Sequence, residues 1–169
     1  PQIAEFEVYD GYSPNNGGGS SVTNGTVDGI YRITPLVSGK AIDVANCQTS
    51  NTTNIQQWDW LNNDCQKFSI TPVDGIWHRI SPVLASAKGF EVATSSTSAG
   101  ANIQLYDYWG GANQQFRFQT AGSGKWRVIP RHSELCLDVA DNSAANGKSI
   151  IQWTCTAGAE NQMFELSRQ

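Results

Sequence analysis

The stretch N-I-Q-Q-W-D-W at residues 54–60 occurs twice more in related form. The other copies are N-I-Q-L-Y-D-Y at 102–108 and S-I-I-Q-W-T-C at 149–155. The aromatic residue of each copy recurs at spacings of 48 and 47 positions: Trp58, Tyr106 and Trp153. Repetition at one period indicates a fold assembled from similar units.

Two further markers keep this period, and a third recurs approximately. A carboxylate stands fifteen residues before each aromatic residue: Asp43, Glu91 and Asp138. A Gln-x-Phe motif follows each aromatic residue: Gln66 with Phe68, Gln114 with Phe116, and Gln162 with Phe164. An aromatic residue opens each unit and is expected on the barrel: Tyr31, Trp77 and Trp126. The markers define three repeats of about 47 residues, at about 27–75, 76–124 and 125–169.

Each repeat contains four short runs of β-forming residues separated by Gly, Asn, Ser and Asp, a pattern typical of all-β proteins. No segment keeps a 3.6-residue period, so we expect almost no helix. Three units are too few to close a propeller. Twelve strands with pseudo-threefold symmetry instead predict a β-trefoil, in which Phe68, Phe116 and Phe164 meet on the axis as the core.

The N-terminal region differs from the repeats. Residues 1–12 read as one strand, and residues 13–26 as a Gly/Ser-rich linker before a domain at 27–169. The strand resembles the closing strand of a discoidin-like jelly roll, which implies an upstream domain; the alternative is a strand added to the main domain. Because the chain begins at Pro1 rather than Met, we expect a mature product or a piece of a longer protein.

The composition excludes several classes of partner. The net charge is −4 and only 15% of residues are charged, so the basic surface that nucleic acid requires is missing. No apolar run reaches the roughly 18 residues that would span a membrane. Amide and hydroxyl side chains instead suit a neutral, polyhydroxylated ligand.

The repeats resemble those of ricin-type β-trefoil lectins, and more closely those of bacterial family 13 carbohydrate-binding modules. The phrases S-G-K-A-I-D-V, L-C-L-D-V-A and N-I-Q-L-Y-D-Y-W-G-G-A-N-Q-Q-F carry this resemblance, over about residues 27–168. The family's threefold Gln-x-Trp motif is Gln-x-Phe here. The resemblance implies a secreted, non-catalytic domain that binds polysaccharide or oligosaccharide without a cofactor.

The resemblance also assigns site residues. In the third repeat, Asp138 would accept hydrogen bonds from sugar hydroxyls, Trp153 would stack on the sugar, Asn161 would donate, and Gln162 would hold Asp138. The first repeat offers Asp43, Trp58 and Gln66. The second repeat offers Glu91, Tyr106, Asn113 and Gln114. The alternative for each repeat is that its ring is partly exposed packing and binds no ligand.

Three departures from the family pattern rank these sites. Cys65 replaces the family's Asn in the first repeat, so a donor is missing unless Asn63 or Asp64 takes its place. Glu91 is longer than Asp in the second repeat, where Trp109 extends the pocket or covers a hairpin. In the third repeat, Ile151 stands where the other two repeats have Gln56 and Gln104. We rank the third site first, the first site next and the second site last.

Four cysteines allow three pairings. The resemblance implies the family's usual disulfide between Cys136 and Cys155, and the remaining Cys47 and Cys65 are then expected to pair. A zinc site is disfavoured by the cysteine spacings of 18 and 19 and by the distant histidines. We therefore expect no metal.

The sequence leaves three candidate functions. The first is carbohydrate binding by up to three weak sites, as an accessory domain covalently linked to a secreted enzyme, such as a glycoside hydrolase, in polysaccharide degradation. The second is catalysis, but a glycosidase needs two carboxylates at one bond and the repeat separates Asp43, Glu91 and Asp138. The third is a protein-binding, inhibitor-like trefoil without a sugar ligand.

Overall fold

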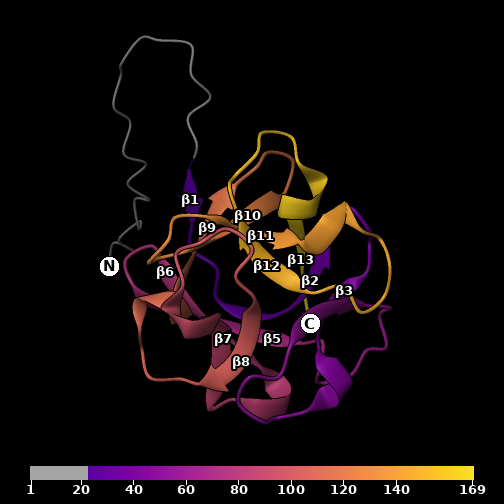
Figure 1. Cartoon of the computed structure of the whole chain (residues 1–169), viewed down its shortest axis with the longest axis vertical. Helices are drawn as coiled ribbons and strands as arrows, with labels where there is room; N and C mark the ends of the chain where they lie inside the picture. The colour runs from indigo at the N-terminus through magenta and orange to yellow at the C-terminus, as the bar shows by residue number, and fades with distance from the viewer. Residues whose placement is uncertain (1–22) are drawn as a thin grey trace, which may run out of the picture.

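The structure, a computed structural model, describes residues 23–169 (Figure 1). The strand predicted at residues 1–12, and residues 13–22 of the predicted linker, lie outside the described residues. The strands are β1 (Asn24–Gly25), β2 (Gly29–Pro35), β3 (Ala41–Val44), β4 (Ile55–Trp58), β5 (Phe68–Asp74), β6 (Trp77–Pro82), β7 (Lys88–Val92), β8 (Ile103–Asp107), β9 (Phe116–Thr120), β10 (Lys125–Pro130), β11 (Cys136–Val139), β12 (Ile150–Trp153) and β13 (Phe164–Arg168). The helical segments are single 3₁₀ turns: η1 (Ala45–Cys47), η2 (Val83–Ala85), η3 (Ala93–Ser95), η4 (Ala112–Gln114), η5 (Ala140–Asn142) and η6 (Glu160–Gln162).

Six strands close into a barrel. Neighbouring strands pair in the order β2, β5, β6, β9, β10 and β13, and β13 returns to β2. Closure leaves no free edge within this ring of strands. The other trefoil strands form three separate hairpins, β3–β4, β7–β8 and β11–β12 (Figure 1). The predicted β-trefoil of twelve strands is therefore confirmed as β2 to β13, and the short β1 adds to β9.

The three hairpins meet one another through isolated bridges. Asn54 bridges to Gln104, Gln56 to Ser149, and Asn102 to Ile151. Side chains of these residues are also hydrogen-bonded. The Asn102 amide donates to Oδ1 of Asn54 at 3.0 Å, and the Asn54 amide donates to Oγ of Ser149 at 3.0 Å. These are equivalent positions of the three repeats, so the pseudo-threefold symmetry extends to side-chain contacts.

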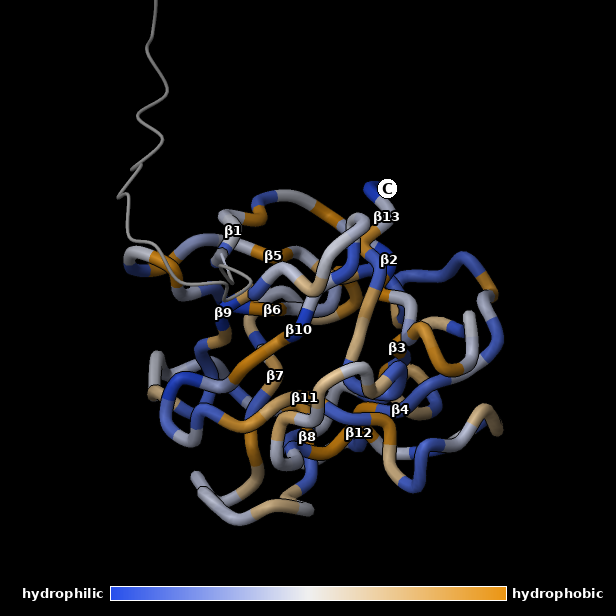
Figure 2. The backbone as a smooth tube through the Cα atoms, turned by 90° about the horizontal axis from the view of Figure 1, so that it is seen from above, coloured by the Kyte–Doolittle hydropathy of each residue, from blue (hydrophilic) through white to orange (hydrophobic). Residues whose placement is uncertain are grey.

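The core consists of the predicted phenylalanines and their aliphatic neighbours. Phe68, Phe116 and Phe164 are each at most 1% exposed. Buried positions alternate with more exposed ones at the start of β5 and along β9, and hydrophobic and hydrophilic segments are interspersed along the backbone in Figure 2. Burying these large side chains from every repeat ties the three units into one domain.

The register of the barrel strands changes one predicted equivalence. The phenylalanines pair with Pro35, Pro82 and Pro130 in β2, β6 and β10. Counting back from these prolines, the residue that matches Tyr31 and Trp126 is His78 and not Trp77. His78 is fully buried, its ring lies edge-on to Phe118, and its Nε2 accepts a hydrogen bond from the Val27 amide at 3.0 Å. Burial lowers the pKa of His78, which indicates a neutral core histidine.

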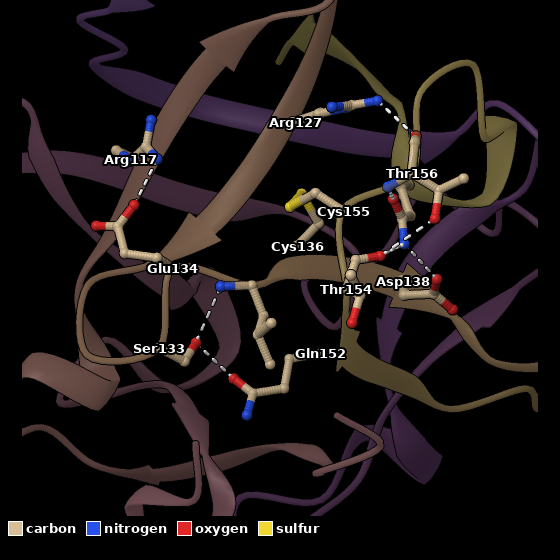
Figure 3. Close-up of a disulfide and its surroundings, with 12 residues drawn as sticks. Arg117, Arg127, Ser133, Glu134, Cys136, Asp138, Gln152, Thr154, Cys155 and Thr156 are labelled. Carbon is tan, nitrogen blue, oxygen red and sulfur yellow. Dashed lines mark hydrogen bonds and ion pairs between the residues drawn. A yellow bond between two sulfur atoms is a disulfide. The ribbon is translucent and has the colours of Figure 1, made fainter. Parts of the chain in front are cut away.

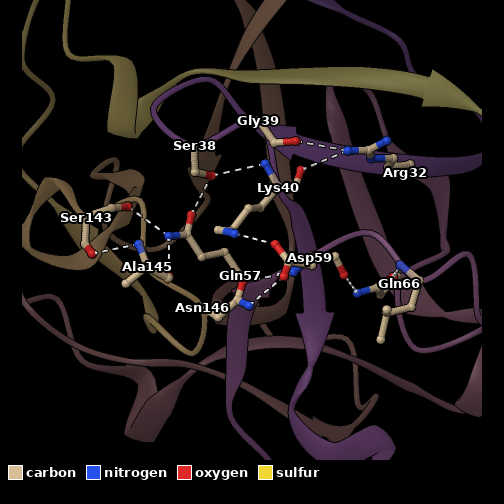
Figure 4. A network of polar contacts seen from close by, with 11 residues as sticks. Arg32, Ser38, Gly39, Lys40, Gln57, Asp59, Gln66, Ser143, Ala145 and Asn146 are labelled. Carbon is tan, nitrogen blue, oxygen red and sulfur yellow. Dashed lines mark hydrogen bonds and ion pairs between the residues drawn. The ribbon is translucent and has the colours of Figure 1, made fainter.

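Polar contacts bind each repeat to its neighbour. The Gln57 amide of the first repeat donates to the carbonyls of Ser143 and Ala145 in the third repeat, both at 2.8 Å (Figure 4). Beside it, Asn146 donates to the Asp59 carboxylate at 2.8 Å, and Lys40 pairs with the same carboxylate. The same trio recurs one repeat later with the residues Asn51, Lys88 and Asp107.

No helix within residues 23–169 is long and apolar enough to cross a membrane.

Candidate functional site

The hairpin register brings each predicted acid beneath the ring of its repeat. Asp138 in β11 lies two residues from Cys136, which is the cross-strand partner of Trp153 in β12. The same register joins Asp43 with Trp58 and Glu91 with Tyr106. Side chains two residues apart on a strand share one face, so acid and ring face the same side of the hairpin.

The third repeat forms a pocket of about 440 Å³. Asp138, Trp153, Asn161 and Gln162 all line it, so the structure brings together every residue predicted for this site. Trp153 is 45% exposed, whereas Asp138 is only 5% exposed. An exposed ring above a recessed carboxylate is an arrangement that can receive a flat ligand with polar edges.

Gln162 holds the Asp138 carboxylate in place. Its Nε2 donates to Oδ2 of Asp138 and to the Thr154 carbonyl, both at 2.9 Å, and its Oε1 accepts from the Thr156 amide at 2.8 Å. Beside Asp138, the disulfide Cys136–Cys155 ties β11 to the segment that follows β12, with 5.1 Å between the Cα atoms (Figure 3). The site is therefore held rigidly before any ligand arrives.

Asp138 keeps one oxygen free. Asn161 donates to Oδ2 at 3.0 Å, the same oxygen that Gln162 contacts, and no described residue donates to Oδ1. Burial raises the pKa of Asp138, the two amide donors lower it, and the negative charge of Asp141 raises it further. The amide nitrogen of Asn161 also donates to the Val139 carbonyl at 3.3 Å. Both of its hydrogens are then used, so Asn161 offers a ligand its Oδ1 acceptor.

The first repeat forms a smaller pocket of about 230 Å³, lined by Asp43, Gln56 and Trp58. Gln56 donates to Oδ1 of Asp43 at 2.9 Å, and burial raises the pKa of this carboxyl. Gln66 is fully buried behind the pocket and bonds the Asp59 carbonyl and the Leu61 amide.

The missing Asn of the first repeat is replaced by a disulfide. Cys65 pairs with Cys47, with 5.2 Å between the Cα atoms, and Cys47 lines the pocket. Asn63 also lines the pocket, and its Oδ1 accepts from the Cys65 amide at 3.1 Å. Asn63, rather than Asp64, therefore supplies an amide at this site.

The second repeat has a pocket of about 330 Å³ in which both oxygens of the acid already accept hydrogen bonds from the protein. Gln104 donates to Oε1 of Glu91 at 3.0 Å, while Gln114 and the Trp109 indole donate to Oε2 at 3.1 and 3.3 Å. Trp109 lines the pocket with Tyr106 and is 62% exposed, so it extends this site. Asn113 is buried and donates to the Val92 carbonyl at 3.1 Å.

Sequence reasoning missed a set of pocket residues in the turns η1, η3 and η5. These turns follow the acid strands directly, and each contains two consecutive non-glycine residues with φ between 50° and 59°. Their side chains line the pockets: Asn46, Thr94, Ser95, Asp141 and Asn142. The repeated phrases D-V-A-N, E-V-A-T and D-V-A-D were a signal that could have revealed them.

No cluster of metal-ligating side chains occurs among the described residues.

Comparisons with known proteins agree with this geometry. Residues 28–167 match the family model of the ricin-type beta-trefoil lectin domain. A designed threefold-symmetric protein, ThreeFoil, is 34% identical with a TM-score of 0.81, and the match covers 84% of this chain and all of that chain. An exo-beta-1,3-galactanase from Clostridium thermocellum is 28% identical with a TM-score of 0.80, and the match covers 83% of this chain but 30% of that chain.

A ricin B-like lectin from Macrolepiota procera, solved in complex with lactose, is 14% identical with a TM-score of 0.69, over 87% of this chain and all of that chain. At this identity the likeness concerns the fold. A comparison with curated protein sequences returns no match. The family model spans most of the chain, and a 34% identical structure covers the same three repeats. The chain therefore belongs to the ricin-type β-trefoil lectin domain family.

Proposed function

We propose that this domain binds carbohydrate without catalysis, and that its third repeat is the principal site. The observation that carries the proposal is the free Oδ1 of Asp138 beneath the exposed Trp153 ring. A pyranose has an apolar face of C–H groups that an indole covers, and a rim of hydroxyls. A buried carboxylate oxygen without a donor accepts such a hydroxyl strongly, because the acceptor is charged.

The three sites are ranked by the acceptor capacity that each acid retains. Asp138 accepts from Asn161 and Gln162 on Oδ2, and Asp43 accepts from Gln56 on Oδ1, so each of these acids keeps its other oxygen for a ligand. Glu91 accepts three hydrogen bonds, spread over both oxygens. Each carboxylate oxygen accepts about two hydrogen bonds. The third and first sites therefore retain the most room for sugar hydroxyls, and the second site relies more on its rings.

Several weak sites on one rigid domain suit a polymer better than a single sugar. Each pocket is shallow and belongs to a different repeat, so three sugar units of one polysaccharide or of neighbouring chains can be held together. Once one site is occupied, the effective concentration of sugar at the next is high, and avidity exceeds the affinity of any one site.

The appended partner that we propose is a secreted polysaccharide-degrading enzyme. A galactanase contains a similar domain over 30% of its chain, and two disulfides suit an extracellular setting. The domain itself lacks paired catalytic carboxylates, because Asp43, Glu91 and Asp138 line three separate pockets. Its task would be to keep the enzyme close to its glycan.

A glycan array followed by titration of the best ligand tests this function. Galactose-containing glycans belong on the array, because the galactanase and the lactose complex concern such sugars. We expect binding that Trp153→Ala weakens strongly and that free sugar competes away. Binding to a protein partner that no sugar displaces, or release of reducing ends from a polysaccharide, would contradict the proposal.

A further inference from the structure

A fourth pocket lies away from the three lectin pockets, on the outer face of the β5–β6 hairpin. Its volume is about 230 Å³. The strand register places Ser69 opposite Ser81 and Thr71 opposite Arg79, so four polar side chains form one patch on the barrel wall. Tyr108, which follows β8, also lines it. The pocket therefore joins the first and second repeats.

The pocket contains a cation without an anion. The Arg79 guanidinium lies over the Tyr108 ring, 4.1 Å from its centroid. One of its nitrogens donates to the carbonyls of Ser86 and Lys88, at 2.5 and 3.2 Å. Arg79 takes part in none of the ion pairs among residues 23–169. No Asp or Glu lines the pocket.

Three polar atoms of the pocket residues are buried without a partner: Oγ of Ser81, the Tyr108 hydroxyl and Nε of Arg79. Ser81 as a whole is only 4% exposed. Leaving one such group unsatisfied costs about 1–3 kcal/mol. Nε of the equivalent arginines Arg32 and Arg127 is also buried without a partner, so it is the two hydroxyls that set this pocket apart and indicate an occupant that supplies their missing hydrogen bonds.

The fold does not require these hydroxyls. At the equivalent positions of the third repeat stand Ile129, which is buried, and Cys155, which is in a disulfide. The first repeat has Thr34 and Trp60, and Arg32 lies over the Trp60 ring, 4.8 Å from its centroid. The stacked arginine is thus shared with the first repeat, whereas the combination of a serine and a phenol is specific to the second repeat.

We propose that this pocket is a further saccharide site, and that it takes a sugar acid through its carboxylate. The guanidinium and the two hydroxyls can all donate to an anionic oxygen, and Pro72 and Val73 offer an apolar side to the sugar ring. The lectin pockets have the opposite preference, because each contains a carboxylate that repels an anion. The site is independent of the three proposed for neutral sugars.

Amide chemical shifts during titration with glucuronic acid test this site, with glucose as the neutral match and sodium sulfate as the anion alone. We expect saturable shifts on β5 and β6 with glucuronic acid and none there with glucose. Tyr108→Phe and Ser81→Ala should each weaken this binding by about tenfold, since each removes a hydrogen bond to a charged group. Ser167→Ala, next to Arg32 on the matching barrel face, is the control and should change nothing.

Each other outcome overturns the inference. Absence of shifts on β5 and β6, or equal shifts with glucose, would exclude a sugar-acid site. Shifts that sulfate alone reproduces in full would mean an adventitious ion only. Both variants replace groups that are unsatisfied in the structure, so they should fold, which thermal unfolding checks. Asp138→Asn should leave the glucuronic acid shifts intact, which separates this site from the third lectin pocket.

Discussion

Ile151 faces Asp138 across the β11–β12 hairpin and leaves Oδ1 of that carboxylate without a donor. The other two hairpins place Gln56 opposite Asp43 and Gln104 opposite Glu91, and both glutamines donate to their acids. A departure from the repeat pattern that looked like a loss in the sequence therefore opens the acceptor on which the proposed function depends.

The first prediction concerns Asp138→Asn. Burial raises the pKa of Asp138 in the folded protein, so the folded state binds this proton more tightly than the unfolded chain. The contribution of Asp138 to stability is therefore greatest below the unfolded pKa and is lost as pH rises through the folded pKa. At neutral pH the substitution should keep or raise the unfolding temperature and abolish sugar binding at the third site. Asp141→Asn is the control at the pocket rim, and a clear loss of stability in Asp138→Asn would contradict the prediction.

The pH dependence of binding follows from the same carboxyl. A sugar hydroxyl donates best to the ionised form, so affinity at the third site should fall when pH drops through the pKa of Asp138. Because burial raises this pKa, the fall should begin at a higher pH than for an exposed aspartate. Calorimetric titration between about pH 7 and pH 4 covers this range. Affinity that stays constant down to the ordinary pKa of aspartate would show that Asp138 does not accept the hydroxyl.

Two aromatic substitutions separate binding from stability. Trp153 is 45% exposed, so Trp153→Ala should remove the stacking platform with little change in the free energy of unfolding. Phe164 is 1% exposed, and Phe164→Ala should lower that free energy by about 3–5 kcal/mol through a core cavity. Denaturant unfolding and sugar titration of both variants check this. The prediction is wrong if Trp153→Ala unfolds the domain or leaves binding at the third site intact.

Replacing the disulfide of the first site should lower the stability of the domain and raise the affinity of this site for sugar. Cys47 and Cys65 correspond to Ser95 and Asn113 of the second repeat, one period later. The double variant Cys47→Ser/Cys65→Asn should lose about 3 kcal/mol of stability, because the disulfide no longer restrains the unfolded chain. It should also gain an amide beside Asp43 and bind sugar more tightly at the first site. Cys47→Ser/Cys65→Ser is the matched control, since it removes the same bond without adding an amide; equal affinities for both variants would refute the role of this amide.

Much of this arrangement could be predicted from the sequence, because repetition shows which residues are equivalent. The repeated markers and the β-forming runs between them were enough to predict the β-trefoil and its phenylalanine core, and the resemblance to ricin-type lectins supplied the pairing of each acid with a ring. Local register was harder. Trp77 is the more similar residue by type, but it lies 46 and 49 positions from Tyr31 and Trp126, whereas His78 lies 47 and 48 positions from them; the strand pairing confirms His78 as the match.

The hydrogen-bond partners of the site side chains could not be predicted from the sequence either. Asn161 was expected to donate to a ligand, but a repeat pattern does not reveal that Asp138 and the Val139 carbonyl already take both amide hydrogens. The turns η1, η3 and η5 escaped attention for a similar reason. Their left-handed residues are ordinary polar types whose unusual φ values arise from the tertiary structure.

The last prediction concerns Thr52, a β-branched residue with φ of 71°. Its amide donates to the Leu105 carbonyl at 2.7 Å, and the matching amides of the other repeats belong to Gly100 and Gly147, with φ of 92° and 81°. A non-glycine residue in the left-handed region destabilises the folded state by about 1–3 kcal/mol. Glycine removes this strain, but it loses more conformational entropy on folding, which offsets about 0.5–1 kcal/mol of the gain. Thr52→Gly should therefore stabilise the domain by about 1 kcal/mol in denaturant unfolding.

The reciprocal change, Gly100→Thr, is the matched control and should destabilise the domain by a similar amount. An ideal Cβ at Gly100 would lie 3.5 Å from the Trp153 ring, an ordinary contact, so the effect should come from the backbone and not from a clash. Thr52 also lines the second pocket, across the repeat boundary from Tyr106. If Thr52→Gly stabilises the domain and at the same time weakens sugar binding at that pocket, the strain is retained for the hydroxyl that Thr52 presents there. If it destabilises the domain, the left-handed conformation of Thr52 is not strained.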